Sequence, residues 1–451
     1  MSACLIDDTR LRQWQTLTLA ILLVGYTGYY ICRSNLSVAT PSLLQEFGPA
    51  GFDRRTIGAI SSAGVLFYAV GKALTGLAGD FAGGRVMFLA GLFGSVLATI
   101  FFSAGSGVAV FASAWVLNRF MQSAGWGGLV KIASHWFSAR RYGTVMAILS
   151  LSYLFGDAIG RYVLGAFLSR GAGWRDVFAI SAAILAGIGA ITLAMLRSSP
   201  RDIGCEEPDV SAHNLYGAAG AESQPTNLRD LLRPYATAVP FWLVCVVSCG
   251  LTLIREAFNA WIPVYLVDVH GLPIGQAAQY SSMFPFVGGL STLAAGMASD
   301  TLSRGARIAI VVPCLVLCAA SLVLLAVASA NHNLTLSLWA IALVAFWLLG
   351  PYSLLAGAVA LDFGGRRGSA TASGLIDSAG YLGAVLSGYA IGTLVERTDW
   401  ATAFRALATV AAAALVAAIA FWYHARKGRA HGPRSYDQDV VRDAGRGAVL
   451  R

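Results

Sequence analysis

Charged residues are scarce in this 451-residue chain, because Asp, Glu, Lys and Arg together make up only 12% of it. A soluble domain carries about 25%, so the composition excludes a water-soluble globular protein. The chain has 6 histidines, and its 7 cysteines form no Cys-x-x-Cys motif. The His-Glu-x-x-His, Gly-x-Ser-x-Gly and Walker-type motifs of common enzymes are also missing. We therefore expect no enzymatic activity, no catalytic residue, no bound metal and no cofactor.

The chain is instead rich in long runs of apolar residues. Apolar residues make up 57% of the chain, the mean hydropathy is +0.65, and runs of about 20 residues are long enough to cross a ~30 Å hydrocarbon core. The pattern predicts an all-α, multi-pass protein of an inner or plasma membrane, in contact with the lipid bilayer. Nucleic acid is not an expected partner, despite the net charge of +9. The twelve predicted transmembrane helices cover residues 14–44, 57–79, 86–104, 108–134, 142–168, 177–197, 239–267, 277–298, 308–328, 334–361, 369–394 and 401–424.

The basic residues between these runs predict the orientation in the membrane. Cytoplasmic loops of membrane proteins are enriched in Lys and Arg. If the N-terminus is inside, the inside loops and the tail hold twenty Lys and Arg, whereas the outside loops hold only Arg54, Arg55, Arg170, Arg175 and Arg397. We therefore expect both termini to be cytoplasmic.

The chain repeats itself once. RSNLSVATP places Arg33 eight residues before Pro41, and REAFNAWIP places Arg255 eight residues before Pro263. Further landmarks recur in the same order, at offsets of 220 to 226 residues: Asp80 with Asp300, Phe137 with Phe363, and Trp174 with Trp400. Parallel repeats of six helices are typical of major facilitator transporters, whose substrate site lies between the halves near the middle of the membrane.

The repeat predicts two pseudo-symmetric six-helix bundles. The segment from Ser198 to Ala238 is rich in Pro, Gly, Asn, Glu and Asp, which is typical of a solvated linker. The predicted domains are an N-terminal bundle (1–197), a cytoplasmic linker (198–238), a C-terminal bundle (239–424) and a basic cytoplasmic tail (425–451).

Two Gly-rich loops, Gly76–Arg85 and Gly296–Arg307, resemble the signature loops of that superfamily. We expect a structural role for their charged residues. Asp80 is suited to capping a neighbouring helix, and Arg85 to meeting carbonyl groups at a helix C-terminus. With their counterparts Asp300 and Arg307, they would hold one conformation of the transporter.

Several charges lie inside the predicted spans, where each Arg or Lys costs about 2.5–3.5 kcal/mol at a helix centre. The basic residues outnumber the acidic ones by about three, which predicts an anionic cargo. The residues in question are Arg33, Lys72, Arg119, Lys131, Arg161 and Arg255 on one side and Asp157, Glu256 and Asp377 on the other.

Arg33 and Arg255 carry the strongest signal, because the repeat places them at equivalent depths in the two halves. Two guanidinium groups that face one cavity could bind a phosphoryl group from both sides, since their planar shape suits bidentate bonding to its oxygens. The alternative is that each arginine is a strut within its own half. Lys131, in the fourth predicted helix, is a further candidate for binding the anion.

At these residues the chain resembles the organophosphate:phosphate antiporter family, in the segments GYTGYYICRSNLSVATPSLLQEFG, FYAVGKALTGLAGD, QSAGWGGLVKIASHWFSARRYGT and GLIDSAGYLG. The likeness extends over nearly all predicted spans. It implies that Arg33 and Arg255 hold the phosphate and that Lys72 assists. It also implies that aromatic residues near the site fall on Tyr26, Tyr30, Tyr68 and Tyr381.

The chain departs from the family pattern at several positions. Tyr153 stands where glycerol-phosphate members have a histidine, and Trp126 lies in Gly-Trp-Gly-Gly instead of Gly-Trp-Pro-Pro. We include both among the substrate-binding candidates. Arg119 begins an Arg-x-x-Gln motif that is associated with proton-coupled members of the wider superfamily. These departures weaken an assignment to glycerol 3-phosphate.

Asp157 and Asp377 are candidates, together with Arg119, for coupling or selectivity. Asp157 lies four residues before Arg161, so a simple ion pair on one helix face is an equally good interpretation. Asp377 has no local partner. It could couple protons, bind sugar hydroxyls, or pair with Arg119 or Lys131 across the bundle.

The sequence as a whole predicts a monomeric antiporter that exchanges an organic phosphate for inorganic phosphate by alternating access. The organic phosphate would be of the sugar phosphate, glycerol phosphate or phosphoglycerate type. Two alternatives remain open at this point: a proton-coupled transporter of another organic anion or drug, and a transporter-like membrane sensor of organic phosphates.

Overall fold

The computed structural model describes residues 2–50, 53–211, 214–301 and 307–430. Regular structure in this part of the chain is helical, and the last part of the predicted tail, 431–451, lies outside the described residues. The first half contains α1 (Ser2–Phe47), α2 (Arg54–Ala82), α3 (Gly84–Ala104), α4 (Val108–Trp136), α5 (Tyr142–Leu168) and α6 (Trp174–Met195). The second half contains α8 (Val239–His270), α9 (Ile274–Ser281), α10 (Met283–Thr301), α11 (Ile308–Ala330), α12 (Leu334–Leu354), α13 (Ala360–Gly364), α14 (Ser369–Arg397) and α15 (Trp400–Ala430).

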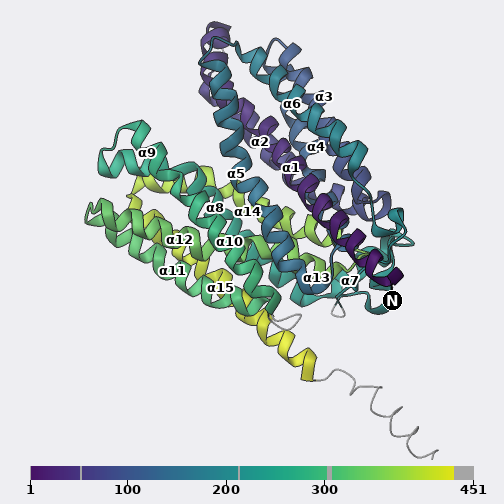
Figure 1. Cartoon of the computed structure of the whole chain (residues 1–451). Helices are drawn as coiled ribbons and strands as arrows, with labels where there is room; N and C mark the ends of the chain where they lie inside the picture. The colour runs from purple at the N-terminus through teal and green to yellow at the C-terminus, as the bar shows by residue number, and fades with distance from the viewer. Residues whose placement is uncertain (1, 51–52, 212–213, 302–306, 431–451) are drawn as a thin grey trace, which may run out of the picture.

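Ten helical segments of the described residues are long and apolar enough to cross a membrane. The helices α4 and α10 fall outside this set but pack inside the same two bundles (Figure 1). In α4 the reason is its buried polar side chains, which include Asn118, Arg119, Gln122 and Lys131. The expected all-α membrane architecture of two bundles is thus confirmed.

The helix boundaries differ from the predicted spans at two places in the second half. The apolar run at 277–298 is divided between α9 and α10, and Pro285 lies in the first turn of α10, where its missing N–H does no harm. The run at 334–361 continues from α12 through a π-helical segment, Leu355–Val359, into α13. Segments of π-helix occur frequently at functional sites.

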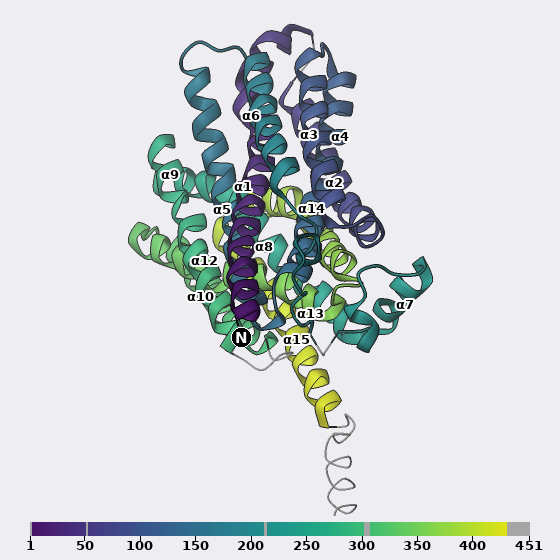
Figure 2. The same cartoon turned by 45° about the vertical axis from the view of Figure 1, so that its right-hand side comes forward.

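The chain between the halves crosses one end of the molecule. This linker contains short 3-10 turns at Pro200–Ile203 and Gly217–Ala221 and the helix α7 (Leu228–Thr237). We call this end the linker end; α7, α13 and the N-terminus lie there (Figure 2). The linker is less solvated than its composition suggests, because Cys205, Ser211 and Leu231 are buried. Small and apolar side chains among the charged ones anchor it to the bundles.

Glycines let the two halves touch near the linker end. The helix α2 meets α14 at Gly76, where a Cβ would lie 2.6 Å from the carbonyl oxygen of Ala370. The repeat places Gly296 of α10 at the equivalent point, where a Cβ would lie 2.6 Å from the carbonyl oxygen of Gly143 in α5. Side chains at these glycines would force the helices apart.

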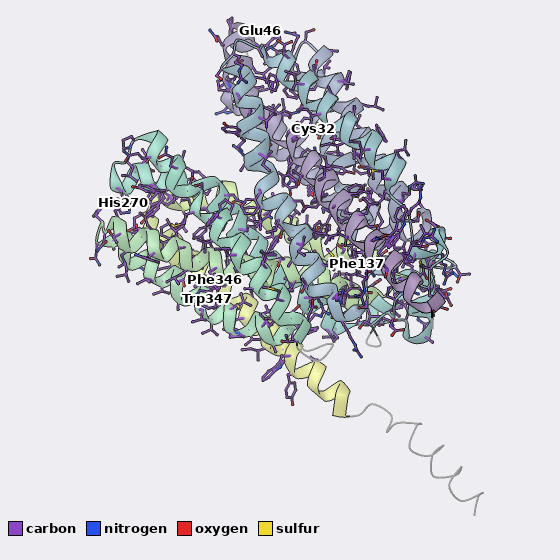
Figure 3. The ribbon with its side chains drawn as sticks, viewed as in Figure 1. Cys32, Glu46, Phe137, His270, Phe346 and Trp347 are labelled. Carbon is purple, nitrogen blue, oxygen red and sulfur yellow. The ribbon has the colours of Figure 1, made fainter. Side chains whose placement is uncertain are left out.

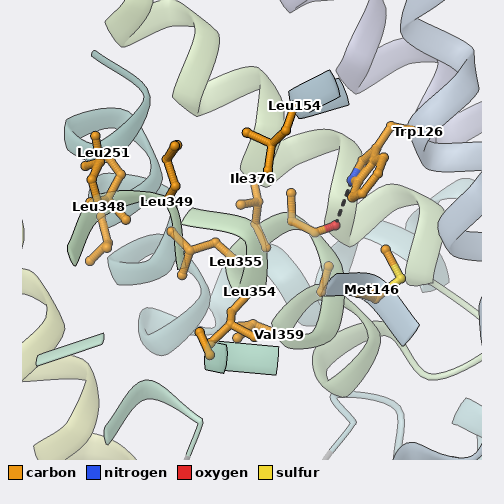
Figure 4. Close-up of a cluster of buried hydrophobic side chains, with 14 of the residues drawn as sticks. Trp126, Met146, Leu154, Leu251, Leu348, Leu349, Leu354, Leu355, Val359 and Ile376 are labelled. Atoms are coloured by element: carbon orange, nitrogen blue, oxygen red, sulfur yellow. Dashed lines mark hydrogen bonds between the residues drawn. The ribbon is translucent and has the colours of Figure 1, made fainter. Parts of the chain in front are cut away.

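The halves meet near the linker end and diverge away from it (Figure 1). Glu46 and His270 mark the separated far ends of the first and second halves (Figure 3). A hydrophobic cluster joins the halves, with Trp126, Met146 and Leu154 from the first half facing Leu355 and Ile376 from the second (Figure 4). The molecule is therefore closed at its linker end.

Candidate functional site

A small pocket lies between the halves, beside this hydrophobic cluster. Helices α1, α2, α4 and α5 contribute one wall, and α8, α12, the π-helical segment and α14 contribute the other. Eight of the ten predicted substrate-binding residues, and also Asp377, line it. The complete lining consists of Tyr26, Tyr30, Tyr68, Lys72, Trp126, Tyr153, Arg255, Tyr352, Ser353, Ala356, Asp377 and Tyr381.

The two repeat-related arginines meet at one hydroxyl group. Arg255 donates a hydrogen bond from Nη2 to the hydroxyl oxygen of Tyr381, at 3.2 Å. Arg33 donates from Nη2 to the same oxygen at 3.5 Å and from Nη1 to the hydroxyl of Tyr30 at 3.3 Å. Arg255 is only 7% exposed. The structure thus brings together two guanidinium groups that lie 222 positions apart in the chain.

The ring of Tyr68 is surrounded by cations. The guanidinium carbons of Arg33 and Arg119 lie 4.6 and 4.4 Å from its centroid, and Nζ of Lys72 lies 5.0 Å away. The ring also makes a T-shaped contact with the ring of Tyr381, with 4.8 Å between centroids. Cations are attracted to the face of an aromatic ring, so Tyr68 holds three positive side chains together at the edge of the pocket.

Lys72 and Asp377 form a buried ion pair across the two halves. Lys72 Nζ lies 2.7 Å from Asp377 Oδ2, and the two side chains are 2% and 9% exposed. Asp377 therefore pairs with Lys72, and neither Arg119 nor Lys131 has a described ion pair with it. Arg119 instead donates from Nη1 to Oε1 of Gln122 at 3.2 Å, within its own helix.

Aromatic rings form the remaining wall of the pocket. Tyr26 packs on Trp126 at 5.3 Å, Trp126 on Tyr153 at 5.7 Å, and Tyr153 on Tyr352 at 6.1 Å between centroids. Tyr352 also lies beneath Arg255, whose guanidinium carbon is 4.5 Å from the ring centroid. Trp126 donates from Nε1 to the carbonyl oxygen of Ala356 at 3.1 Å, which ties the halves together (Figure 4).

Two predicted site residues lie away from the pocket. Lys131 is buried near the linker end, where its Nζ lies 2.9 Å from Asp80 and donates to the carbonyl oxygen of Arg366. Asp157 forms an ion pair with Arg161 at 2.7 Å, with side chains 38% and 57% exposed. The pair within one helix accounts for both charges on α5.

The signature aspartates cap helices of the opposite half. Asp80, at the end of α2, accepts from the backbone N–H groups of Ala370 and Thr371 at 3.3 and 2.7 Å. Asp300, at the end of α10, accepts from Gly143 and Thr144, both at 2.7 Å. Both carboxylates face the positive end of a helix dipole, the first of α14 and the second of α5.

The signature arginines hold carbonyl and carboxylate groups. Arg85 donates to the carbonyl oxygen of Leu193 at 2.8 Å, near the C-terminus of α6. Arg307 donates to the carbonyl oxygen of Ala139 at 2.7 Å and lies 3.0 Å from Asp362 and 3.6 Å from Asp300. Arg307 thus contacts both halves, whereas the described contact of Arg85 lies within the first half.

The linker carries a further charged cluster that sequence reasoning missed. Glu207 lies 2.8 Å from Nδ1 of His135, 3.0 Å from Arg201 and 3.2 Å from Arg366. Burial raises the pKa of Glu207, but His135, Arg366 and Arg201 outweigh burial and hold the pKa below its usual range. Because His135 belongs to the first half and Arg366 to the second, Glu207 bridges them.

Tyr352, Ser353 and Ala356 also line the pocket and were not predicted. The repeat contains a signal for the first of them, because the offset of 226 that relates Trp174 to Trp400 also relates Trp126 to Tyr352. Ser353 and Ala356 have no such aromatic counterpart. Among the described residues no group of three or more His, Cys, Asp or Glu is arranged to hold a metal ion.

Comparison with curated proteins finds relatives along most of the chain. The "Probable hexose phosphate transport protein" of Chlamydia pneumoniae is 26% identical, over 91% of this chain and 92% of that protein. The "Membrane sensor protein UhpC" of Escherichia coli is 26% identical, over 88% and 90%. The "Glycerol-3-phosphate transporter" of Bacillus subtilis is 25% identical, over 92% and 95%.

Solved structures share the fold at low identity. The proton:xylose symporter XylE, bound to 6-bromo-6-deoxy-D-glucose, gives a TM-score of 0.73 at 13% identity, over 91% of this chain and 96% of that one. FucP in the outward conformation gives 0.69 at 13%, over 90% and 99%. The family model described as Major Facilitator Superfamily matches residues 22–388. With its two helical bundles and a pocket between them, this integral, multi-pass membrane protein belongs to the major facilitator superfamily.

Proposed function

We propose that the protein is an antiporter that exchanges an organic phosphate for inorganic phosphate. The observation that carries the proposal is the convergence of Arg33 and Arg255, one from each half, on the hydroxyl of Tyr381. A phosphoryl group between the two guanidinium groups would accept hydrogen bonds from both. The names of the relatives, which include hexose phosphate and glycerol-3-phosphate transporters, support the same substrate class.

The arrangement of charge supplies a mechanism for exchange. Without an anion, the two guanidinium groups repel each other across the pocket, and this opposes closure of the halves around an empty site. A bound phosphoryl group removes the repulsion and draws the halves together, so that the site changes sides only when loaded. The moving units are the two bundles, 1–197 and 239–424, joined by the linker at 198–238.

The basic residues at the linker end, among them Arg140, Arg141, Arg366 and Arg367, support a cytoplasmic orientation of this end. The closed linker end then corresponds to a site that faces outward. Opening toward the cytoplasm breaks the contacts of Asp80 with α14 and of Asp300 with α5. We propose that the protein works as a monomer, because one chain supplies both walls of the pocket.

Proteoliposomes test the proposal. Vesicles loaded with inorganic phosphate are given labelled hexose phosphates, glycerol 3-phosphate or phosphoglycerates outside, and uptake is compared for the wild type, Arg33→Lys and Arg255→Lys. Lysine keeps the charge but loses the bidentate geometry, so we expect exchange to fall at least about tenfold in each variant. Arg161→Lys is the matched control, because this exposed arginine pairs with Asp157 away from the pocket.

Other outcomes of this experiment would contradict the proposal. Undiminished exchange in both pocket variants would exclude the paired-arginine site. Uptake that follows a proton gradient and ignores internal phosphate would indicate a proton-coupled transporter of another anion.

A membrane sensor is the second candidate function, because relatives named as membrane sensor proteins match most of the chain. A sensor would bind organic phosphates at the same two arginines without moving them across the membrane. Binding to the purified protein, measured beside flux through the same preparation, separates the two functions. Saturable binding with no flux favours the sensor.

A further inference from the structure

A carboxylate lies beside one of the two arginines. Glu256 follows Arg255 in α8 and forms an ion pair through Oε1 with the Nη2 atom of Arg255. The same Nη2 donates to the hydroxyl of Tyr381. Neighbouring residues of a helix point about 100° apart and do not normally face each other. The contact therefore requires both side chains to turn toward the same space between the halves.

Glu256 is more accessible than Arg255 and Asp377. Its side chain is 29% exposed, compared with 8% for the side chain of Arg255 and 9% for that of Asp377. Because α8 runs away from the linker end, Glu256 lies one residue closer to the separated ends of the bundles. The carboxylate thus lies directly beside Arg255, on the side of the separated ends of the bundles.

Arg255 does not use all of its hydrogen-bond donors. Its Nε atom is buried and has no hydrogen-bond partner among the described residues. An arginine that binds a phosphoryl group in bidentate fashion uses two parallel N–H groups. In the present arrangement Glu256 and Tyr381 share one Nη atom of this arginine. The arginine is thus held by a carboxylate and still has an unused donor.

We propose that Glu256 is an internal counter-anion, which holds Arg255 in the unloaded site and is displaced by the phosphoryl group of the substrate. This inference rests on the proposed function. Displacement is favourable for a dianion with three terminal oxygens, because it replaces one carboxylate contact with several charge-assisted hydrogen bonds. A monocarboxylate ligand would only replace the Glu256 carboxylate with its own carboxylate, so it would gain little binding free energy. Glu256 therefore selects phosphate esters over carboxylates, and its return to Arg255 assists release.

The variant Glu256→Gln tests this role, because glutamine keeps the size of the side chain and removes the charge. Equilibrium binding to the purified, full-length protein is measured with inorganic phosphate and, separately, with glycerate. In the variant the anion no longer competes with a charged carboxylate for the N–H groups of Arg255. We therefore expect phosphate to bind about tenfold tighter to the variant, and glycerate binding to rise above its wild-type level. Maximal exchange in proteoliposomes should fall, because release is slower.

Asp157→Asn is the matched control, since it removes a carboxylate that pairs with Arg161 outside the pocket. Glu256→Asp, which retains the charge, should bind phosphate close to the wild-type level. A gain in binding together with slower exchange would not result from mere damage to the fold.

Weaker or unchanged phosphate binding to Glu256→Gln would overturn the inference. Glycerol 3-phosphate is measured in the same way, and a selective loss of its binding would also overturn the inference, because Glu256 would then contact the organic group of the substrate. If the wild type neither binds nor exchanges phosphate, the proposed function fails as well. If Arg255→Lys impairs exchange while Glu256→Gln does not tighten binding, the counter-anion alone is excluded.

Discussion

Tyr381 lies between two side chains that would otherwise repel each other. Its hydroxyl oxygen accepts from Arg33 and from Arg255, and its ring packs on Tyr68. Cation–π contacts of Tyr68 and Tyr352 with the same two arginines add to this neutral support. Aromatic rings and hydroxyl groups thus support both arginines without adding charge, and the carboxylate beside Arg255 is that of Glu256.

The ion pair of Lys72 with Asp377 predicts a double-mutant effect. Removing one partner of a buried pair leaves an uncompensated charge, which costs about 3–5 kcal/mol, whereas replacing both with apolar residues is often neutral. We expect Lys72→Met and Asp377→Leu to lower the melting temperature of the purified protein. The double variant should melt close to the wild type. Equal melting of all four proteins would show that the pair is not formed in solution.

Arg33 and Arg255 could be predicted as partners from the repeat, because equivalent positions of two similar halves lie at the same depth in the membrane. The partner of Asp377 was not predictable, since Lys72 is 305 residues away and the choice among several basic residues depends on how the halves pack. The partner of Lys131 was unpredictable for the same reason. Its position inside a predicted span suggested the substrate site, but α4 carries it past the pocket to Asp80.

At the scale of the helices, α2 and α14 cross so closely that we expect a single added methyl group at Gly76 to disfavour the closed conformation. In Gly76→Ala the new Cβ would lie 2.6 Å from the carbonyl oxygen of Ala370. Overpacking of this kind costs about 1–3 kcal/mol, and here it acts against the closed linker end. We expect the exchange rate in proteoliposomes to fall.

Gly58→Ala, in the same helix, is the control for this prediction, because nothing lies within 4 Å of its Cβ position. It should leave exchange unchanged, since alanine is the better helix former. Identical exchange by both variants would show that the two helices have room to separate at Gly76.

The helices themselves were largely predictable from the apolar runs. Their interruptions were less so. The break between α9 and α10 falls at two serines, Ser281 and Ser282, inside a predicted span. The π-helical segment Leu355–Val359 lies within an apolar stretch, where hydropathy gives no signal. The π-helical segment also supplies the carbonyl oxygen of Ala356, which accepts from Trp126 and from Ser373.

At the scale of the whole molecule, the linker makes contacts that its composition did not predict. Arg366, from the second half, forms an ion pair with Glu207 and donates to the carbonyl oxygen of Pro208. Its own N–H donates to Gly220 at 2.8 Å. A solvated linker was expected because charged and turn-forming residues dominate this segment. Its binding to both halves depends on tertiary contacts that only the folded arrangement provides.

Hydrogen exchange of the linker amides tests these contacts. In Arg366→Gln we expect the backbone amides around Pro208 and Ala221 to exchange faster, because the side chain loses its ion pair with Glu207 and its charged hydrogen bonds to these two carbonyl groups. The control is Arg201→Gln, which also removes a partner of Glu207. That arginine is 68% exposed, so its contribution should be small. Equal protection in both variants would contradict a fastening role of Arg366.

The linker contacts also determine which part of the chain travels with which bundle. Trp136 donates to the carbonyl oxygen of Arg197, and Ala139 donates its N–H to Asp209, so the segment as far as Asp209 belongs with the first half. Leu215 donates to Phe363, and the hydroxyl of Tyr235 donates to Gly368, so the rest belongs with the second half. In the proposed exchange cycle the two halves would therefore separate within the linker, between Asp209 and Leu215. The contacts of Arg366 with Glu207 and Pro208 cross this boundary and would have to break, and α7 would move with the second bundle.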